Sequence, residues 1–140
     1  MTIELDDHRR RNLDAIERIF AAVGAGDAAA QCANYTDDIV LETPFADPPG
    51  RREGRDVIES YLTAAFGVFR FGLRITEVHP CLDPDELIVE FEGFDGTYLP
   101  NGAAYENTYI GVFRFRDGLV CFQREYFNPL GAMRAAAGDT

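Results

Sequence analysis

Four long segments rich in aromatic and β-branched residues dominate the second half of the chain. They are Phe69–Val78, Glu86–Leu99, Ala104–Arg116 and Leu119–Phe127. The turn signals between them are Asp83-Pro84, Pro100-Asn101-Gly102 and Asp117-Gly118. Such residues favour strands, and dipeptides such as Asp-Gly favour tight hairpins. We therefore expect an antiparallel meander whose two faces are both too apolar to be left in water.

The first half of the chain has the apolar spacing of helices, with one short strand. Helices are predicted over Asp7–Val23, Ala28–Tyr35 and Arg55–Phe66. Between the last two, an apolar stretch predicts a strand at Ile39–Thr43, followed by a proline-rich loop at Pro44–Gly54. A short helical tail is expected over Pro129–Ala137.

This order of elements predicts a single α+β domain over residues 1–140. The economical arrangement is a strongly curved, mostly antiparallel sheet whose concave face holds the three N-terminal helices and encloses a cavity. Gly93, Gly96 and Gly111 fit such bending, since sheets curve at glycines and bulges. The outer face would then be covered by a second copy, which predicts a homodimer.

The amino-acid composition argues against several catalytic mechanisms and several kinds of binding partner. All 13 basic residues are arginine, so Schiff-base, P-loop and kinase lysines are impossible. Ser60 is the only serine, and it lies inside a predicted helix without the glycine elbow of a serine nucleophile. The net charge of −11 argues against nucleic acid and anionic membranes as partners.

Cofactor, metal and targeting signals are missing from the sequence. Cys32, Cys81 and Cys121 lack CxxC spacing, which indicates neither a disulfide framework nor a zinc ribbon but reduced thiols. Neither His8 nor His79 has an evident second metal ligand, and no cofactor motif occurs. With no apolar targeting or spanning segment, we expect a cytoplasmic protein with no cofactor and no metal.

Several short motifs resemble the NTF2-like superfamily in its SnoaL-like branch. They are Tyr35-Thr36-Asp37-Asp38, Glu53-Gly54-Arg55 and Glu125-Tyr126-Phe127-Asn128-Pro129. The second half further resembles the phenazine-biosynthesis A/B proteins, through Asp83-Pro84, Val89-Glu90, Gly93, Tyr105-Glu106-Asn107 and Arg124-Glu125. The resemblance implies a cone-shaped, cystatin-like dimer with a small-molecule cavity. The superfamily also holds ketosteroid isomerases, polyketide cyclases, epoxide hydrolases, dehydratases and transport adaptors, so fold alone does not fix the chemistry.

The same resemblance narrows the candidate catalytic residues. Thr43 stands where the isomerases have their aspartate base, and strand alternation puts Glu42 on the opposite face. Asn128 falls at or near the aspartate position of the polyketide cyclases, and an amide cannot replace that acid. In the phenazine group a glutamate of the closing motif is the acid/base, and Glu125 matches it. The cavity histidine of that group has no counterpart in Arg55–Phe71, which argues against its particular condensation.

The hairpin register gives a second expectation for Glu125. A two-residue Asp117-Gly118 turn sets Ile110 opposite Glu125. Glu125 would then share its face with Glu106, Thr108, Ile110, Val112, Cys121 and Gln123, and desolvation would raise its pKa. The other face carries Asn107, Tyr109, Phe113, Phe122, Arg124 and Tyr126, and it is aromatic enough to be the pocket instead. In that case Glu125 would be a solvated or interface carboxylate.

Further candidate residues would bind the substrate, and Asn128 and Arg55 are among them. Tyr35, Tyr61 and Tyr105 could donate hydrogen bonds to a carbonyl, or be ordinary core aromatics. Glu106 would lie near the pocket rim, or simply face solvent. The arginines Arg51, Arg52 and Arg55 flank the proline-rich loop and suit bidentate capture of a carboxylate, or serve only solubility.

Two functions follow as hypotheses. The first is a cofactor-free acid/base enzyme of small-molecule secondary metabolism. It would act on a cyclic or polyketide-like carbonyl compound, carboxylated or not, by condensation, cyclisation, isomerisation or dehydration. The second is a non-catalytic module in which the same fold binds a small ligand or a protein.

Overall fold

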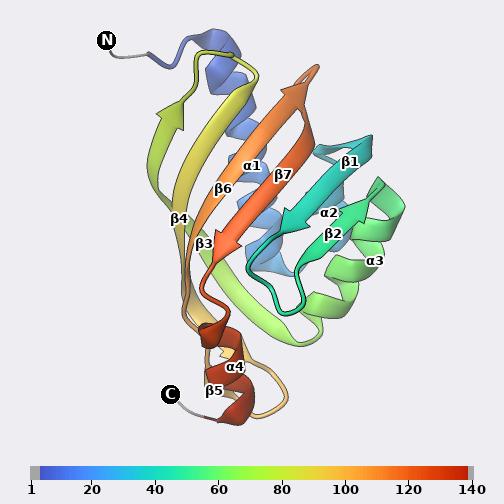
Figure 1. Ribbon diagram of the computed structural model, residues 1–140, viewed down its shortest axis with the longest axis vertical. Coiled ribbons are helices and arrows are strands. Elements are labelled where there is room, and N and C mark those ends of the chain that lie inside the picture. The colour runs from blue at the N-terminus through green and yellow to red at the C-terminus, as the bar shows by residue number, and fades with distance from the viewer. Residues whose placement is uncertain (1–3, 139–140) are drawn as a thin grey trace.

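The structure is a computed structural model and describes residues 4–138 (Figure 1). In chain order its elements are α1 Asp7–Ala25, α2 Ala28–Cys32, β1 Tyr35–Thr43, β2 Gly50–Glu53, α3 Arg55–Phe66, β3 Phe69–Pro80, β4 Glu86–Tyr98, β5 Ala103–Ala104, β6 Thr108–Arg116, β7 Leu119–Phe127 and α4 Leu130–Ala137. No helix in the described part of the chain is long and apolar enough to cross a membrane.

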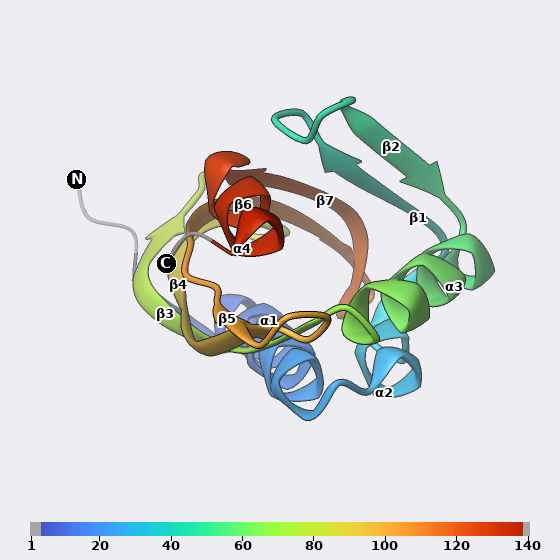
Figure 2. The same cartoon turned by 90° about the horizontal axis from the view of Figure 1, so that it is seen from below.

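The strands form one curled, unclosed sheet in the order β2-β1-β7-β6-β4-β3, with β5 attached to β4. The four strands β3, β4, β6 and β7 make the predicted antiparallel meander. Strand β1 pairs parallel to β7, and β2 pairs antiparallel to β1. Seen along the curl, the sheet bends around an interior that α1, α2 and α3 cover on the concave side, as expected (Figure 2).

Capping residues define the ends of the helices on this side. The Asp6 side chain accepts a hydrogen bond from the Arg9 amide at 2.8 Å and caps α1. Gly26, at φ 66°, ends α1 in the left-handed conformation that glycine adopts without strain. Asp27 caps α2 through the Ala30 amide at 3.0 Å.

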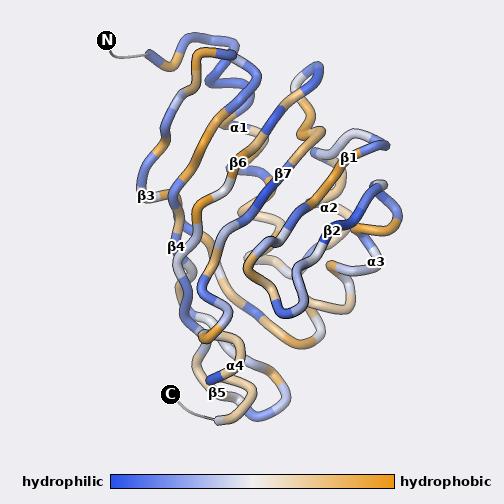
Figure 3. The backbone as a smooth tube through the Cα atoms, viewed as in Figure 1, coloured by the Kyte–Doolittle hydropathy of each residue, from blue (hydrophilic) through white to orange (hydrophobic). Residues whose placement is uncertain are grey.

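The core lies between α1 and the concave face of the sheet. The Phe20 ring of α1 packs against Phe91, with ring centroids 4.6 Å apart, and against Phe113 at 6.4 Å. Phe91 in turn stacks on Tyr109 at 4.8 Å. The hydropathy colouring shows apolar stretches in β4 and β6 beside a hydrophilic middle of β7 (Figure 3). Within this stretch of β7, Gln123 is buried on the concave side and Arg124 points to the outer face.

The structure differs from the prediction in the second helix, the first strand and the proline-rich loop. The first strand begins at Tyr35 rather than at Ile39. The second helix ends at Cys32 rather than Tyr35, because the Asn34 carbonyl accepts a hydrogen bond from Val120 of β7 at 2.8 Å and Tyr35 already belongs to β1. The proline-rich loop contains β2, a four-residue edge strand whose polar sequence gave no strand signal.

The predicted strand Ala104–Arg116 is also interrupted. Residues Ala103–Ala104 form β5, and β6 begins only at Thr108. Between them the backbone crosses close over Gly96, where a Cβ atom would lie 1.9 Å from the Tyr105 carbonyl oxygen. The crossing carries Tyr105 into the interior of the curled sheet.

The hairpin between β6 and β7 contains a bulge. Arg116 pairs with Leu119 and Phe115 with Val120, as predicted, but Arg114 pairs with Phe122. Cys121 is thus an extra residue, and every later pair is shifted by one. Glu125 lies opposite Gly111 rather than Ile110, so the predicted register was wrong from this point on.

Candidate active site

A cavity of about 250 Å³ opens inside the curled sheet. Its wall comes from every layer of the fold: Val23, Gln31, Leu41, Thr43, Tyr61, Leu62, Ala65, Phe66, Phe69, Phe71, Leu73, Tyr105, Tyr109, Gln123, Glu125, Phe127 and Ala132. Most of these side chains are aliphatic or aromatic. A cavity of about 150 Å³ already admits benzene, so this one has room for a molecule of one or two rings.

Among residues 4–138, Glu125 is the only carboxylate in the wall of this cavity. Within residues 4–138 no ion pair or hydrogen bond reaches its carboxyl group. Burial alone raises the pKa of Glu125 to about 7, because the charged form loses water without gaining a partner. Near neutral pH this group exists in both protonation states, as a general acid or base requires.

A pair of phenols lies in the same wall. The hydroxyl groups of Tyr105 and Tyr109 are 3.1 Å apart, and the Asn107 amide donates to the Tyr105 hydroxyl at 3.0 Å. Burial raises the pKa of both tyrosines, so both keep their protons. Only one proton can lie between the two oxygens, so one hydroxyl of the pair always has a proton free for a ligand.

A second buried chain of hydrogen bonds orients Gln123. The Gln31 amide donates to the Tyr35 hydroxyl at 2.9 Å, and Tyr35 donates to the Gln123 carbonyl oxygen at 2.8 Å. Gln123 lies two residues before Glu125 on the same strand face and lines the cavity. Its oxygen accepts from Tyr35, and its amide N–H groups form no hydrogen bond within residues 4–138, which leaves them available to a ligand in the cavity.

The structure gathers some of the predicted site residues and not others. Glu125, Tyr61 and Tyr105 line the cavity together. Tyr35 lies behind the wall, where it holds Gln123. Glu106 is exposed and lies outside the cavity, because the residues before β6 turn its side chain away.

Asn128 and Arg55 also lie outside. Asn128 is exposed after the end of β7, and its backbone carbonyl accepts from Asn107 at 2.9 Å. It therefore supports the phenol pair without facing the cavity. Arg55 forms an ion pair with the exposed Asp37 and donates a hydrogen bond to the Tyr35 carbonyl at 3.2 Å. These contacts connect α3 to the start of β1.

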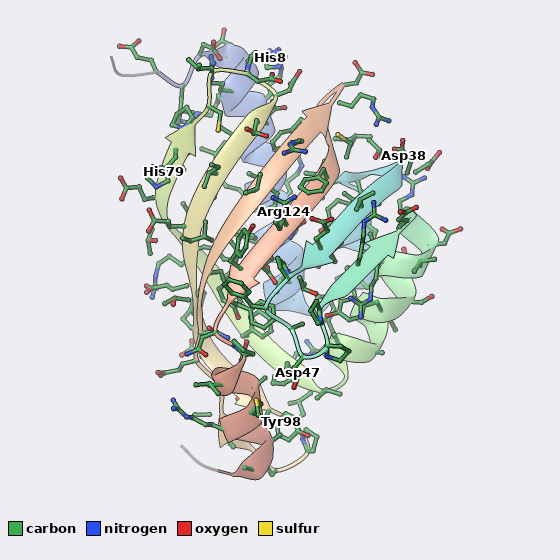
Figure 4. All side chains as sticks on the ribbon, viewed as in Figure 1. His8, Asp38, Asp47, His79, Tyr98 and Arg124 are labelled. Atoms are coloured by element: carbon green, nitrogen blue, oxygen red, sulfur yellow. The ribbon has the colours of Figure 1, made fainter. Side chains whose placement is uncertain are left out.

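The first strand follows the predicted alternation. Thr43 is buried in the cavity wall, whereas Glu42 lies on the outer face, where Arg124 donates to it at 2.8 Å. Figure 4 labels Arg124 on that outer face. The position that matches the isomerase base thus faces the cavity but carries no carboxylate.

Tyr109 and Gln123 are the site residues that sequence reasoning missed. Gln123 was placed on the face of Glu125, but it was given no role. Tyr109 was assigned to the opposite face, because a bulge at Cys121 was not anticipated. Of that alternative face, Tyr109 and Phe113 of β6 do point inward, and the bulge puts Glu125 on their side, whereas Arg124 of β7 lies on the outer face. The strongly aromatic alternation of β6 was the signal available for Tyr109.

The outer face holds a group of possible metal ligands that the sequence did not indicate. Donor atoms of Glu77, His79 and Glu90 all lie within 4.8 Å of one another, and His79 Nε2 is 2.5 Å from a Glu90 oxygen. His79 is labelled near the β3 edge of the sheet in Figure 4. Its ion pair with Glu90 accounts for this arrangement, far from the cavity.

Comparison with known proteins assigns the family. The SnoaL-like domain model matches residues 16–122, and the chain therefore belongs to the SnoaL-like family, which has the NTF2-like fold. An uncharacterized PhzA/B-like protein of Pseudomonas aeruginosa is 37% identical over 120 residues, which cover 81% of each chain. The expected family and fold class are confirmed.

Solved structures repeat the same architecture. One from Bacillus subtilis named a putative isomerase is 25% identical, covers 96% of this chain and 98% of its own, and has a TM-score of 0.88. A putative polyketide cyclase of Xanthomonas campestris is 23% identical, with coverages of 92% and 98% and a TM-score of 0.79. A phenazine biosynthesis-related protein of Pseudomonas aeruginosa is 22% identical, with coverages of 94% and 88% and a TM-score of 0.78. The last two establish likeness of fold alone.

Proposed function

We propose that this protein is a cofactor-free acid/base enzyme that acts on a small cyclic carbonyl compound. The observation that carries the proposal is the Glu125 carboxyl in an apolar cavity, with its pKa raised to about 7. A carboxyl with this pKa can remove a proton next to a carbonyl and return it elsewhere on the same molecule. Isomerisation, aldol-type cyclisation or condensation, and dehydration of carbonyl compounds share the removal of a proton next to the carbonyl.

The polar groups around Glu125 support the same chemistry. The free proton of the Tyr105–Tyr109 pair and the N–H groups of Gln123 are donors on the cavity wall. Removing a proton next to a carbonyl puts negative charge on its oxygen, and fixed donors stabilise that charge. The PhzA/B-like relative and the solved structures named isomerase and cyclase are consistent with this class of reaction.

A test needs no knowledge of the natural substrate. Cyclohexanone in D₂O exchanges its α-protons when a general base acts on it, and NMR follows the exchange. We expect the wild-type protein to accelerate exchange at pH 7, and Glu125→Gln to lose at least about 100-fold of that acceleration. Glu106→Gln removes an exposed carboxylate outside the cavity and is the matched control. Exchange by Glu125→Gln at the wild-type rate would contradict the proposal.

The alternative is a ligand-binding module without chemistry, favoured by the largely apolar cavity wall. In that case wild type and Glu125→Gln would bind ring compounds equally well, and neither would catalyse exchange. A cytoplasmic location, independence from cofactors and a homodimer joined through the outer sheet face belong to the proposal as expectations from the sequence.

A further inference from the structure

The three arginines beside the proline-rich loop differ in their surroundings. Arg51 forms ion pairs on the outside, with Glu42 at 3.4 Å and with Glu53. Arg55 pairs with Asp37. Arg52 forms no ion pair with any carboxylate of residues 4–138.

An unpaired guanidinium is unexpected at this position. The chain has 24 acidic residues for 13 arginines, so carboxylates are in excess. Four arginines in the described chain are partly buried, and three of them pair with carboxylates: Arg9 with Asp6, Arg55 with Asp37 and Arg124 with Glu42. Arg52 is the fourth. A partly buried charge without a partner costs free energy, so a ligand that supplies the opposite charge is stabilised there.

Arg52 lies against the cavity wall. On β2 it stands opposite Leu41, a cavity residue, and its Cζ atom is 3.6 Å from the centroid of the Tyr61 ring. A Cβ atom at Gly50 would lie 3.0 Å from Arg52 Nη1 and 2.5 Å from Thr43 Oγ1, so the guanidinium also lies close to Thr43. Tyr61 and Thr43 both line the cavity. Strand β2 and α3 lie side by side at the edge of the curl (Figure 2).

We propose that Arg52 binds the carboxylate of a small organic acid whose ring occupies the cavity. The planar guanidinium can donate two parallel hydrogen bonds to a carboxylate, and stacking on Tyr61 holds it in place before the ligand arrives. The Tyr61 ring would then lie beside the bound acid, between its carboxylate and the interior. The inference names the substrate class for the proposed function and rests on it only in that respect, because binding can be measured without turnover.

Benzoate and benzamide are matched probes, since they share size and ring and differ in charge. Calorimetric titration of the full chain at pH 6 keeps benzoate ionised while Glu125 stays mostly protonated. We expect wild type to bind benzoate about ten-fold or more tightly than benzamide, the size of one charge-assisted hydrogen bond. Equal affinity for the two, or no binding of benzoate at millimolar concentration, would overturn the proposal.

Variants of Arg52 test whether this residue causes the preference for benzoate. Arg52→Gln should bind benzoate and benzamide with equal affinity and leave the benzamide affinity within about two-fold, and Arg52→Lys should keep part of the preference. Arg51→Gln removes the same charge from the neighbouring, outward-facing position and should keep all of it. An unchanged preference in Arg52→Gln, with an unchanged melting temperature, would refute the assignment.

Failure of this inference and failure of the proposed function are distinguishable. Loss of the benzoate preference in Arg52→Gln, with exchange chemistry unaffected by Glu125→Gln, would leave a carboxylate-binding protein without the proposed catalysis. Suppose instead that Glu125→Gln loses exchange and the wild type shows no preference for benzoate. The protein would then still be the proposed enzyme, but its substrate would not be a carboxylic acid.

Discussion

The hydroxyl groups of Tyr105 and Tyr109 lie 3.1 Å apart in the wall of the cavity that holds Glu125. The two residues come from the crossing segment before β6 and from β6 itself. Asn107, between them in sequence, donates to the Tyr105 hydroxyl and fixes the pair. The pair is therefore a structural link as well as a source of a donor for the ligand.

We predict that Tyr105→Phe lowers the free energy of unfolding by about 1–3 kcal/mol. The substitution leaves the buried Asn107 amide and the Tyr109 hydroxyl without one of their partners, and unpaired buried polar groups cost this much. Urea denaturation measures the change. Tyr98→Phe is the control, because Tyr98 is less buried and its hydroxyl forms no hydrogen bond in the described chain. Equal stability of the two variants would contradict the role given to the pair.

Tyr109→Phe is predicted to slow α-proton exchange of cyclohexanone by about 100-fold while leaving the fold intact. The substitution removes the hydroxyl that hydrogen-bonds Tyr105, so the remaining Tyr105 proton is no longer oriented by the pair toward the carbonyl oxygen, and losses of this size follow removal of an oriented donor. The measurement is the exchange rate at saturating ketone, with circular dichroism as a check of folding. An unchanged rate would mean that the ketone oxygen binds elsewhere.

Glu125 makes stability depend on pH in a definite direction. The folded protein holds the Glu125 proton up to about pH 7, whereas the unfolded chain releases it near 4.5. The contribution of this carboxyl to the free energy of unfolding is thus complete below pH 4.5 and is lost as pH rises to 7. The loss is at most about 3 kcal/mol.

The comparison of wild type with Glu125→Gln isolates this contribution. Denaturation at pH 5 and pH 8 should show the wild type losing stability relative to the variant as the pH rises. Glu106→Gln, which changes an exposed carboxylate, should follow the wild type. Parallel curves for wild type and Glu125→Gln would show that Glu125 does not titrate with a raised pKa.

The outer sheet face supports a prediction about assembly. Ile110 is 45% exposed there and Phe45 is 56% exposed, with Phe45 packed against Tyr126 at 5.2 Å. We expect a homodimer through this face, with a sedimentation mass twice the 15.6 kDa of one chain. Ile110→Glu should shift the mass toward one chain. A wild-type protein that sediments as one chain at micromolar concentration would refute the expectation.

Much of the fold could be predicted from local sequence signals. The Asp117-Gly118 turn and the β7 limits, Leu119–Phe127, agree with the structure, because both depend on neighbouring residues only. The helix predicted over Asp7–Val23 likewise matches α1 to within two residues. The short strand β2 could not be predicted, since its polar residues are held by pairing with β1 and not by their own preference.

The site was harder to predict because it depends on register. Glu125 was identified, but its neighbours were not. The extra residue Cys121 shifts the register, so Glu125 lies on the same face as Tyr109 and not beside Ile110 and Val112. Likewise, the sequence could not distinguish Arg52 from Arg55, because the difference lies in which guanidinium meets a carboxylate brought there by another strand.

The proposed function requires Glu125 to be a protonatable group in the cavity at neutral pH. The most direct test is a ¹³C NMR pH titration of the glutamate side-chain carboxyls, with the Glu125 signal assigned by its absence in Glu125→Gln. We predict a titration midpoint for Glu125 at about pH 7. A midpoint near its ordinary value of 4.5 would contradict the account.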